Sequence, residues 1–540
     1  MLVFTDKARP VAECDVVVVG SGFGGTLAAH ELMRSGARVV MLERGDWVPR
    51  GPQAWAATSV GTLTPHYSLE TPYRVLAGGE APVMGSFSCV GGPSVFYGGV
   101  SLRFRAEDFD PDPEIAGDSG ARWPFGYGEL EPWYTRAEQI IGVAGEAGDD
   151  PTAPPRSAPY PQCGGALSPT SRRVWEAAQS LGWRPFRLPL AFNHAKTPGR
   201  AACAACGTCD LFACAIGAKN DLATAVLPRL LARGLVLRRR TVAVHLVARS
   251  GRVREIECVD RLNGRPVRIA ASAFVLAAGA LASPHLVLAS GLDRESPAPQ
   301  AIGRYLMRHW NAVVAGIFPS RPDPEAPFHK QVGVHDFYFG HPDVKEPAGK
   351  LGGLQQLSTP PPALLKAHLP PGLGAALEPL VPHITGLLVI AEDQPRAENR
   401  VALAESGRDR FGLPQLLVRH AYSARDQAAG RALVAQARRL LGRAGAWGTK
   451  LHEIRSFSHA VGTLRMGADP QTSPVDPDGR FRGLDNLYVA DASVFPTSAA
   501  VNPSLTIAAG ALRIGAGLAA RRFSSPGAWA TAEAPSSSAA

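Results

Sequence analysis

A glycine-rich turn near the N-terminus constrains the fold of this 540-residue chain more than any other feature. Residues 15–19, four valines after Asp15, predict a buried strand, and the G-x-G-x-x-G turn of residues 20–25 follows it directly. The sequence then predicts a helix over 26–35 and a second strand over 38–42 that ends at Glu43. Strand, turn, helix, strand and acid in this order predict a βαβ unit that binds an adenine dinucleotide, either NAD or FAD.

Three glycines and one acid of this unit are candidate cofactor ligands. Gly20, Gly22 and Gly25 allow a tight turn, close approach of the backbone to a pyrophosphate and close packing of the helix on the strand. The helix N-terminus directs unpaired N–H groups at the phosphates. Glu43 is the expected acceptor for ribose hydroxyls.

Length and charge indicate a large enzyme rather than a nucleic-acid-binding or membrane protein. A chain of 540 residues exceeds one ordinary core, so two closely packed domains are expected. The net charge of +9 is spread over many arginines, and the single basic run, 238–240, lies between two strand-like stretches. No stretch reaches the ~18 apolar residues of a membrane span, and charged residues occupy the N-terminus where a signal peptide is apolar. We therefore expect a cytoplasmic protein.

Four of the eight cysteines lie close together, since Cys203, Cys206, Cys209 and Cys214 form C-x2-C-x2-C-x4-C. This density without a secretion signal favours metal, iron–sulfur or redox use over a disulfide framework. The spacing resembles a ferredoxin-type run, although the fourth cysteine lies one residue further on and no proline follows it. An iron–sulfur cluster is one interpretation of these four cysteines. The alternatives are reduced structural thiols, one local disulfide and a zinc site.

Four further motifs, one of them in two parts, occur along the chain. Residues 91–99 form a second glycine-rich loop, and residues 275–291 predict a buried strand, a turn at Gly279 and a helix beginning near Pro284. Residues 459–467 contain His459 before a G-T-L-R-M-G run, with the N-P-S-L-T-I segment at 502–507, and residues 487–496 predict a strand that leads to Asp491. Together these segments resemble the glucose–methanol–choline (GMC) flavoprotein oxidoreductases, and the resemblance extends over most of the chain.

The resemblance implies an α/β fold with a discontinuous Rossmann-like FAD-binding domain and a substrate domain of mixed sheet and helices. Residues 1–110, 200–305 and 455–523 are assigned to the FAD-binding domain, and residues 111–199 and 306–454 to the substrate-binding domain. The tail 524–540, rich in Ser, Pro and Ala, has the composition of a disordered segment.

The resemblance also implies FAD as the cofactor and oxidation of an alcohol CH–OH group to a carbonyl as the reaction. His459 is the expected base for the hydroxyl proton and Asn502 its hydrogen-bonding partner, while a hydride passes to flavin N5. Helix N-terminal amides after Pro503 would stabilise negative charge on the reduced flavin. The residues expected at the cofactor are Gly20, Gly22, Gly25, Glu43, Gly92, Ser94, Val242, Gly279, Asp491, Asn502, Pro503 and Ser504.

Several activities are compatible with this resemblance. The cysteine-rich segment and residues 217–220 resemble both cholesterol-oxidase-like members and the catalytic subunits of bacterial FAD-dependent sugar dehydrogenases, some of which hold an iron–sulfur cluster. The first implies a hydrophobic alcohol as the small-molecule substrate, and the second implies a sugar and an electron-acceptor protein. A cyanohydrin-type lyase with structural FAD and a non-catalytic FAD-holding subunit are the alternatives, and the presence of His459 and Asn502 argues against the latter. The alcohol itself does not follow from the sequence.

Some acids and histidines fall outside the motifs. Glu392 is expected to be either a substrate-side carboxylate or a partly exposed acid at a strand end. Five histidines are expected to be loop or core residues, with any in the substrate domain a candidate for lining the pocket: His309, His329, His335, His383 and His420.

Overall fold

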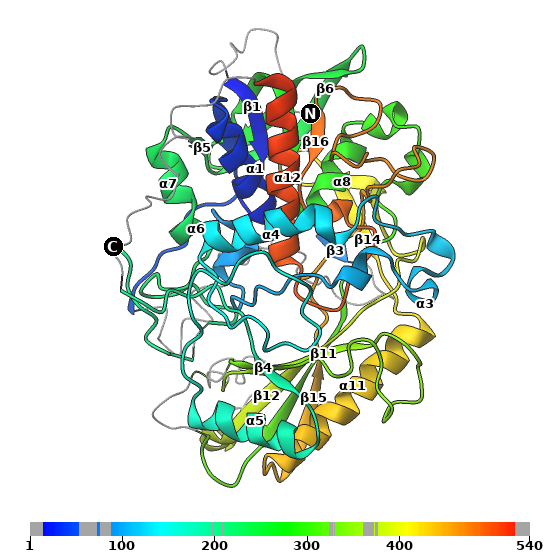
Figure 1. The fold of residues 1–540 in the computed structure, drawn as a ribbon. Coiled ribbons are helices and arrows are strands. Elements are labelled where there is room, and N and C mark those ends of the chain that lie inside the picture. Colours follow the sequence, from blue (N-terminus) through cyan, green and yellow to red (C-terminus); the bar gives the residue numbers. More distant parts are fainter. Residues whose placement is uncertain are drawn as a thin grey trace.

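Two large β-sheets organise the chain, and helices pack against each of them (Figure 1). The computed structural model describes residues 14–52, 88–196, 199–207, 209–322, 328, 330–359, 372 and 376–523, together with the backbone of 73–75. The expected tail 524–540 and His329 lie outside the described residues. A mixed α/β architecture, as the motifs predict, is confirmed by this arrangement.

The first sheet contains the predicted dinucleotide-binding unit. Its strands are β1 (Cys14–Val19), β2 (Val39–Leu42), β5 (Val236–Arg238), β6 (Thr241–Arg249), β7 (Arg252–Asp260), β8 (Pro266–Leu276) and β16 (Leu487–Val489). Strands β5, β2, β1, β8 and β16 are parallel neighbours in that order, whereas β7 and β6 extend the sheet antiparallel from β8. The predicted strands at 15–19 and 38–42 are therefore confirmed as β1 and β2.

Helices α1 (Phe23–Arg34) and α12 (Ser504–Arg522) pack closely beside this sheet (Figure 1). A Cβ on Gly515 would lie 2.8 Å from the carbonyl oxygen of Ala28, so the glycine sets the close approach of the two helices. The sequence places the start of α1 at residue 26, which is wrong by three residues. Glycine disfavours helix, but Gly24 and Gly25 lie inside α1 because both pack against backbone where no side chain fits.

Helix α8 (Gly279–Ala289) also begins earlier than predicted, with Pro284 in its interior rather than at its start. A proline at this position cannot donate to the carbonyl of Ala280 four residues earlier. The hydroxyl of Thr463 donates to that carbonyl instead, at 2.6 Å. The missing helical hydrogen bond is thus replaced from the segment that carries His459.

The second sheet lies at the other end of the molecule and is antiparallel. Its order is β15-β9-β12-β11-β10-β4, with bounds Gly448–Glu453, Trp310–Ile317, Ile384–Ala391, Gly352–Leu357, Val332–Val334 and Pro185–Arg187. Helices α11 (Ala424–Arg443) and α5 (Pro169–Ser180) cover one face, where Leu433 and Leu440 share a core with Val314 and Val389 (Figure 1). The opposite face of the sheet is therefore the one available to a site.

The remaining elements connect these parts. Strands β13 (Arg400–Arg408), β14 (Pro414–Arg419) and β3 (Tyr73–Val75) form a small sheet. The other helices are α3 (Pro113–Ala116), α4 (Tyr127–Ile141), α6 (Leu222–Ala225) and α7 (Leu227–Ala232), with short 3-10 turns at Gly92–Val95, Ala106–Phe109, Gly117–Ser119, Leu292–Glu295, Pro299–Ala301, Glu378–His383 and Ala492–Val494. Helix α4, from a segment assigned to the substrate domain, packs on α12, and the domain boundaries remain a prediction.

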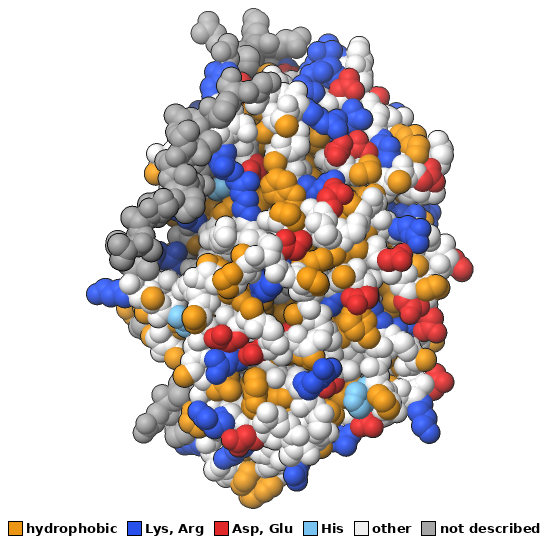
Figure 2. All heavy atoms as spheres, in the orientation of Figure 1, with side chains coloured by type: hydrophobic (Ala, Val, Ile, Leu, Met, Phe, Trp, Pro, Cys, Tyr) orange, Lys and Arg blue, Asp and Glu red, His pale blue; other side chains and the backbone are white. Residues whose placement is uncertain are grey.

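Charges of both signs are interleaved on the face shown in Figure 2. The basic run 238–240 forms the end of β5 and the turn before β6, and Arg239 and Arg240 both pair with Asp46. The run therefore spans a strand end and a turn, and two of its three arginines pair with an acid. Within the described part of the chain, no helix is both long and apolar enough to cross a membrane.

Candidate active site

Backbone packing around the first turn brings several loops together at the carboxyl ends of the parallel strands. Gly20 has a φ of +104°, and a Cβ there would clash with the carbonyl of Ala277 after β8. A Cβ on Gly24 would clash with the carbonyl of Ala490 after β16. The loops after β1, β8 and β16 are therefore in contact, as at the ligand edge of an open α/β sheet.

Gly22 differs from its neighbours, because no atom lies within 4 Å of where its Cβ would be. Gly279, with a φ of +89°, is open in the same way. Gly25 is closed, since a Cβ there would clash with the carbonyl of Gly20, so this glycine packs the helix against the strand. Backbone that is bare and unobstructed at two of these loops fits a bound dinucleotide.

Glu43 lies at the end of β2 and is buried. Its carboxylate accepts hydrogen bonds from the Ser21 hydroxyl at 2.5 Å and from the N–H groups of Ser21 and Gly45. Burial raises the pKa of Glu43 above its ordinary value, although these three donors favour the ionised form. Ser21 also accepts from the N–H of Gly91, so the second glycine-rich loop is tied to the first turn.

The other residues expected near the adenosine and the glycine-rich loop are placed beside these groups. A Cβ on Gly92 would lie 3.0 Å from the Cα of Gly22. The Ser94 hydroxyl is used within the protein, since it donates to Gly91 and accepts from Leu222. Val242 is buried in β6, directly after Thr241, whose N–H donates to the Glu43 carbonyl.

Asp491 follows β16 and uses its carboxylate to join two loops. It accepts from the Gly279 N–H and the Ser283 hydroxyl on one oxygen, and from the Ser493 N–H and hydroxyl on the other. Burial raises the pKa of Asp491 despite these donors. Because protein groups take up the carboxylate, the side chain holds the Gly279 turn in place.

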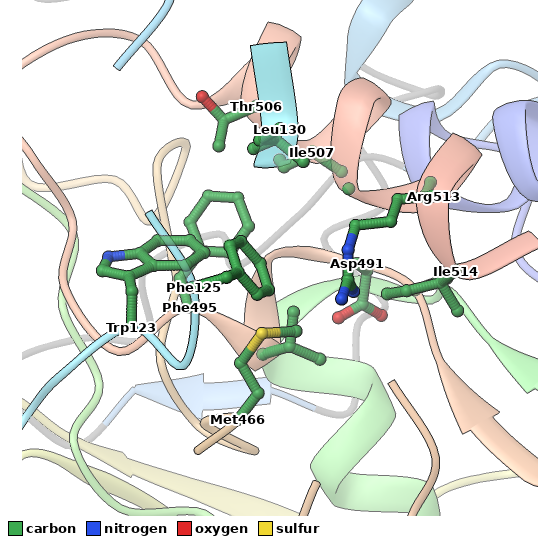
Figure 3. A pocket seen from close by; sticks show the side chains of 14 residues that line it. Trp123, Phe125, Leu130, Met466, Asp491, Phe495, Thr506, Ile507, Arg513 and Ile514 are labelled. Carbon is green, nitrogen blue, oxygen red and sulfur yellow. The ribbon is translucent and has the colours of Figure 1, made fainter. Parts of the chain in front are cut away.

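A mainly apolar cavity lies beside Asp491, between α12, the end of β16 and residues 123–130 (Figure 3). Trp123, Phe125, Met466 and Phe495 line it, and Arg513 reaches its edge. Neither His459 nor Asn502 lines this cavity. We therefore do not place the reaction there.

His459 lies in the loop after β15 and contacts a second histidine. Its Nδ1 is 3.0 Å from Nδ1 of His309, and Nε2 of His309 is 3.0 Å from the carbonyl oxygen of Ser498. Burial, with the neighbouring His309 and Lys330, lowers the pKa of His459 to about 3. Burial also lowers the pKa of His309. Both rings are therefore neutral at neutral pH, as a base requires.

Asp393 fixes the backbone around this pair. Its two carboxylate oxygens accept from the N–H groups of Arg308 and His309, from the Ser498 hydroxyl and from Nε2 of His420. The pKa of Asp393 is lowered, because these donors and the nearby histidines outweigh its burial. One buried carboxylate thus connects the His309 segment to the 498–504 loop.

Asn502 lies at the end of that loop, one residue before the N-cap of α12. Its Oδ1 accepts a hydrogen bond from Nε2 of Gln355 on β11 at 2.7 Å. The amide Nδ2 has no protein partner within the described residues. Pro503 caps α12, and the Ser504 hydroxyl donates to the Val100 carbonyl. The structure thus leaves the Asn502 N–H groups free to donate.

Glu392 is buried, contrary to its interpretation as a partly exposed strand-end acid. It forms an ion pair with Lys350, which also pairs with Asp108. Tyr338 donates to Asp108 and accepts from the N–H of Ala500. Tyr338 thereby links this group of charges to the 498–502 loop. The charge of Lys350 balances that of Glu392 within the protein.

The four clustered cysteines all fall within the described residues. Cys209 is buried and the other three are partly exposed, and none of the four forms a disulfide. The Lys219 ammonium donates to the carbonyls of Cys209, Phe212 and Tyr97 and so links this segment to the second glycine-rich loop. No group of three or more Cys, His, Asp or Glu side chains in the described part of the chain is placed to hold a metal ion. The residues as placed do not fit a cluster, and the iron–sulfur hypothesis stays a prediction for iron and sulfide analysis.

The structure therefore brings most of the predicted site residues together and adds residues that are not predicted to belong to the site. His309, expected to be a loop or core residue, contacts His459 directly, whereas His335 and His383 bond within the protein. Gln355 comes from the second sheet and Asp393 from the segment after it, and neither is predicted as a site residue. They are identified only by their hydrogen bonds to the 498–502 loop.

Comparisons with known proteins agree with this geometry. Two family models described as GMC oxidoreductase match residues 15–311 and 395–511. The 6'''-hydroxyparomomycin C oxidase of Streptomyces lividus is 33% identical over 529 residues, which cover 92% of this chain and 90% of that protein. Paromamine 6'-oxidase of Streptomyces fradiae is 32% identical over 531 residues, with coverages of 92% and 90%. Pyridoxine 4-oxidase from Mesorbium loti shares the fold, with a TM-score of 0.63 at 21% identity and coverages of 94% and 99%.

Proposed function

The chain belongs to the GMC oxidoreductase family, and from this premise we propose that it uses FAD to oxidise the CH–OH group of an alcohol to a carbonyl, with His459 as the base. The observation that carries the proposal is the contact of His459 with His309, which bonds in turn to the Ser498 carbonyl in the segment that leads to Asn502. Burial lowers the pKa of His459, which favours its neutral form. A binding module or scaffold has no use for such a base.

The cofactor assignment rests on the open backbone of two loops. Gly22 and Gly279 present bare backbone with no protein atom nearby, and Glu43 lies at the β2 end where a ribose is expected. The residues proposed to hold FAD are Gly20, Gly22, Gly25, Glu43, Gly92, Ser94, Val242, Gly279, Asp491, Asn502, Pro503 and Ser504. Asp491 acts by holding the Gly279 turn.

In the proposed reaction the substrate hydroxyl gives its proton to His459, and the carbon that bears this hydroxyl loses a hydride. FAD, when bound, would supply N5 as the hydride acceptor. Asn502 donates a hydrogen bond from Nδ2 to the substrate oxygen, because Gln355 occupies its Oδ1. Burial, Lys330 and His309 disfavour the charged form of His459, so the base is neutral before the reaction. Asp393 favours the charged form and so stabilises the proton that His459 takes up.

The substrate class we propose to test first is the hydroxymethyl group of an amino sugar or sugar. This rests on the two relatives above, whose names describe oxidases of paromamine and a hydroxyparomomycin. Anaerobic mixing with amino sugars, sugars, sterols and simple alcohols, followed at the flavin absorbance, distinguishes these classes. A lyase substrate would leave the flavin oxidised, whereas an alcohol substrate bleaches it.

The central test is His459→Ala. Loss of a positioned base should slow flavin reduction by about 10²–10⁴-fold while FAD content stays unchanged. His383→Ala serves as the matched control, because His383 bonds to the Phe318 carbonyl on the second sheet and has no role in the proposal. Equal reduction rates in wild type and His459→Ala would remove His459 from the chemistry.

A further inference from the structure

The two neighbouring histidines form a hydrogen-bond chain with a defined direction. The Ser498 carbonyl can only accept, so the ring of His309 must carry its proton on Nε2. A neutral His309 then has its lone pair on Nδ1. Since that atom lies 3.0 Å from Nδ1 of His459, the His459 Nδ1 must be the donor. The lone pair of His459 is consequently on Nε2, the ring nitrogen that His309 does not contact.

From this chain of hydrogen bonds we infer that His309 is a positioning residue, which holds His459 in the tautomer with Nε2 free to accept the substrate proton. The inference rests on the proposed function of His459 as the base. It gives His309 the part that a carboxylate or carbonyl has when it orients a reacting histidine. Without His309, either nitrogen of His459 could carry the proton.

Backbone strain at both ends of this hydrogen-bond chain supports the positioning role of His309. His309 has a φ of +62° and Ala499, directly after Ser498, a φ of +54°. Non-glycine residues in the left-handed region are strained and persist where surrounding contacts enforce them. Asp393 provides those contacts, because it bonds to the His309 N–H and to the Ser498 hydroxyl. Tyr422 adds a hydrogen bond to the His309 carbonyl at 2.7 Å.

The surrounding charges are consistent with a pair that is neutral at rest. Lys330 and His309 disfavour a proton on His459, and Asp393 favours it. At His309, Asp393 and the Ser498 carbonyl favour the proton, but burial and Lys350 disfavour it and lower the pKa. When His459 takes the substrate proton, its Nδ1–H still points at the His309 lone pair, so the new charge is shared without a second proton transfer.

Two substitutions at His309 test the inference, chosen because both residues tolerate a positive φ. In His309→Asn the side-chain oxygen can replace the Nδ1 acceptor, whereas in His309→Gly no acceptor remains. Flavin reduction should fall about 10–100-fold in His309→Gly, the cost seen when a histidine loses the partner that orients it. His309→Asn should recover most of that loss, with FAD content equal in both variants.

A spectroscopic measurement tests the tautomer directly. In 15N-histidine-labelled wild-type protein, the His459 resonances, identified by their absence in His459→Gln, should show a proton on Nδ1 and a lone pair on Nε2. A proton on Nε2 in the wild type, or equal losses in the Gly and Asn variants, would overturn the inference. If His459→Ala keeps the wild-type rate, the proposed function fails instead. If His459→Ala is slow while His309→Gly is not, only the role of His309 fails.

Discussion

At the scale of single residues, the site depends on which atom of each polar side chain is already occupied. Asn502 could present either its oxygen or its nitrogen to a substrate, and Gln355 decides between them by donating to Oδ1. His459 has two ring nitrogens, and its contact with His309 makes them unequal. The motifs predict the reacting residues, but their orientation comes from partners on other segments, which no local pattern reveals.

Replacing Gln355 by Leu should therefore slow flavin reduction by about 5–10-fold, because the lost hydrogen bond lets the Asn502 amide rotate. Gln356→Leu is the matched control. Gln356 is the next residue on β11, so it faces the other side of the strand, and its buried amide atoms lack partners in the described residues. An apolar side chain there should leave both rate and stability unchanged or slightly improved. Equal rate losses in both variants would mean that Gln355 does not orient Asn502.

At the scale of elements, the first βαβ unit is predictable because its strands, turn and helix each carry a local signal. Strands β1 and β2 follow from the apolar runs, but the start of α1 does not. Gly24 is helical because the Ala490 carbonyl packs against it from a segment more than 460 residues away. Likewise α8 contains Pro284 because Thr463 replaces the missing hydrogen bond. Both errors arise from tertiary contacts that override local preference.

The glycines of the turn give a prediction that separates fold from cofactor. Gly22→Ala has room for its methyl group and an ordinary φ of −71°, so the protein should fold with nearly unchanged stability. The methyl group would, however, occupy the space proposed for the pyrophosphate, and FAD content after purification should fall sharply. Gly24→Ala should instead destabilise the protein, because its methyl group clashes with backbone. Full FAD occupancy in a folded Gly22→Ala variant would contradict the cofactor assignment.

His285 on helix α8 gives a prediction for how the stability of the protein depends on pH. His285 is buried and its Nε2–H donates to the Pro414 carbonyl, and burial lowers its pKa from 6.5 to about 4. The unfolded chain takes up this proton as the pH falls below 6.5, but the folded protein does not until about pH 4. Stability is therefore lost on acidification across that window, by up to about 3 kcal/mol from this residue. His285→Gln can keep the hydrogen bond without titrating, so its unfolding free energy should depend less on pH between 6.5 and 4. Parallel pH profiles for urea unfolding of both proteins would exclude this contribution.

At the scale of the whole molecule, the two sheets meet where their loops supply the site. The α/β class and the family follow from motifs that are local in the sequence, such as the turn at 20–25 and the run before Asp491. The second sheet carries no such motif, and so Gln355 and Asp393 could not be placed from the sequence. Helices α11 and α5 nevertheless cover only one face of this sheet, and the Gln355 side chain on β11 lies on the other face.

Removal of FAD should lower the stability of the first part of the molecule more than that of the second. The proposed contacts come from loops after β1, β2, β8 and β16, which the bound cofactor would tie together. A ligand present at 1,000 times its Kd stabilises the folded state by about 4 kcal/mol, so the apoprotein should unfold several degrees lower. Hydrogen exchange should show where this stability lies. The backbone of residues 20–25, 91–99 and 277–279 should lose protection without FAD, whereas β9 and β12, buried under α11, should keep theirs. Unchanged protection of the three loops on FAD removal would place the cofactor elsewhere.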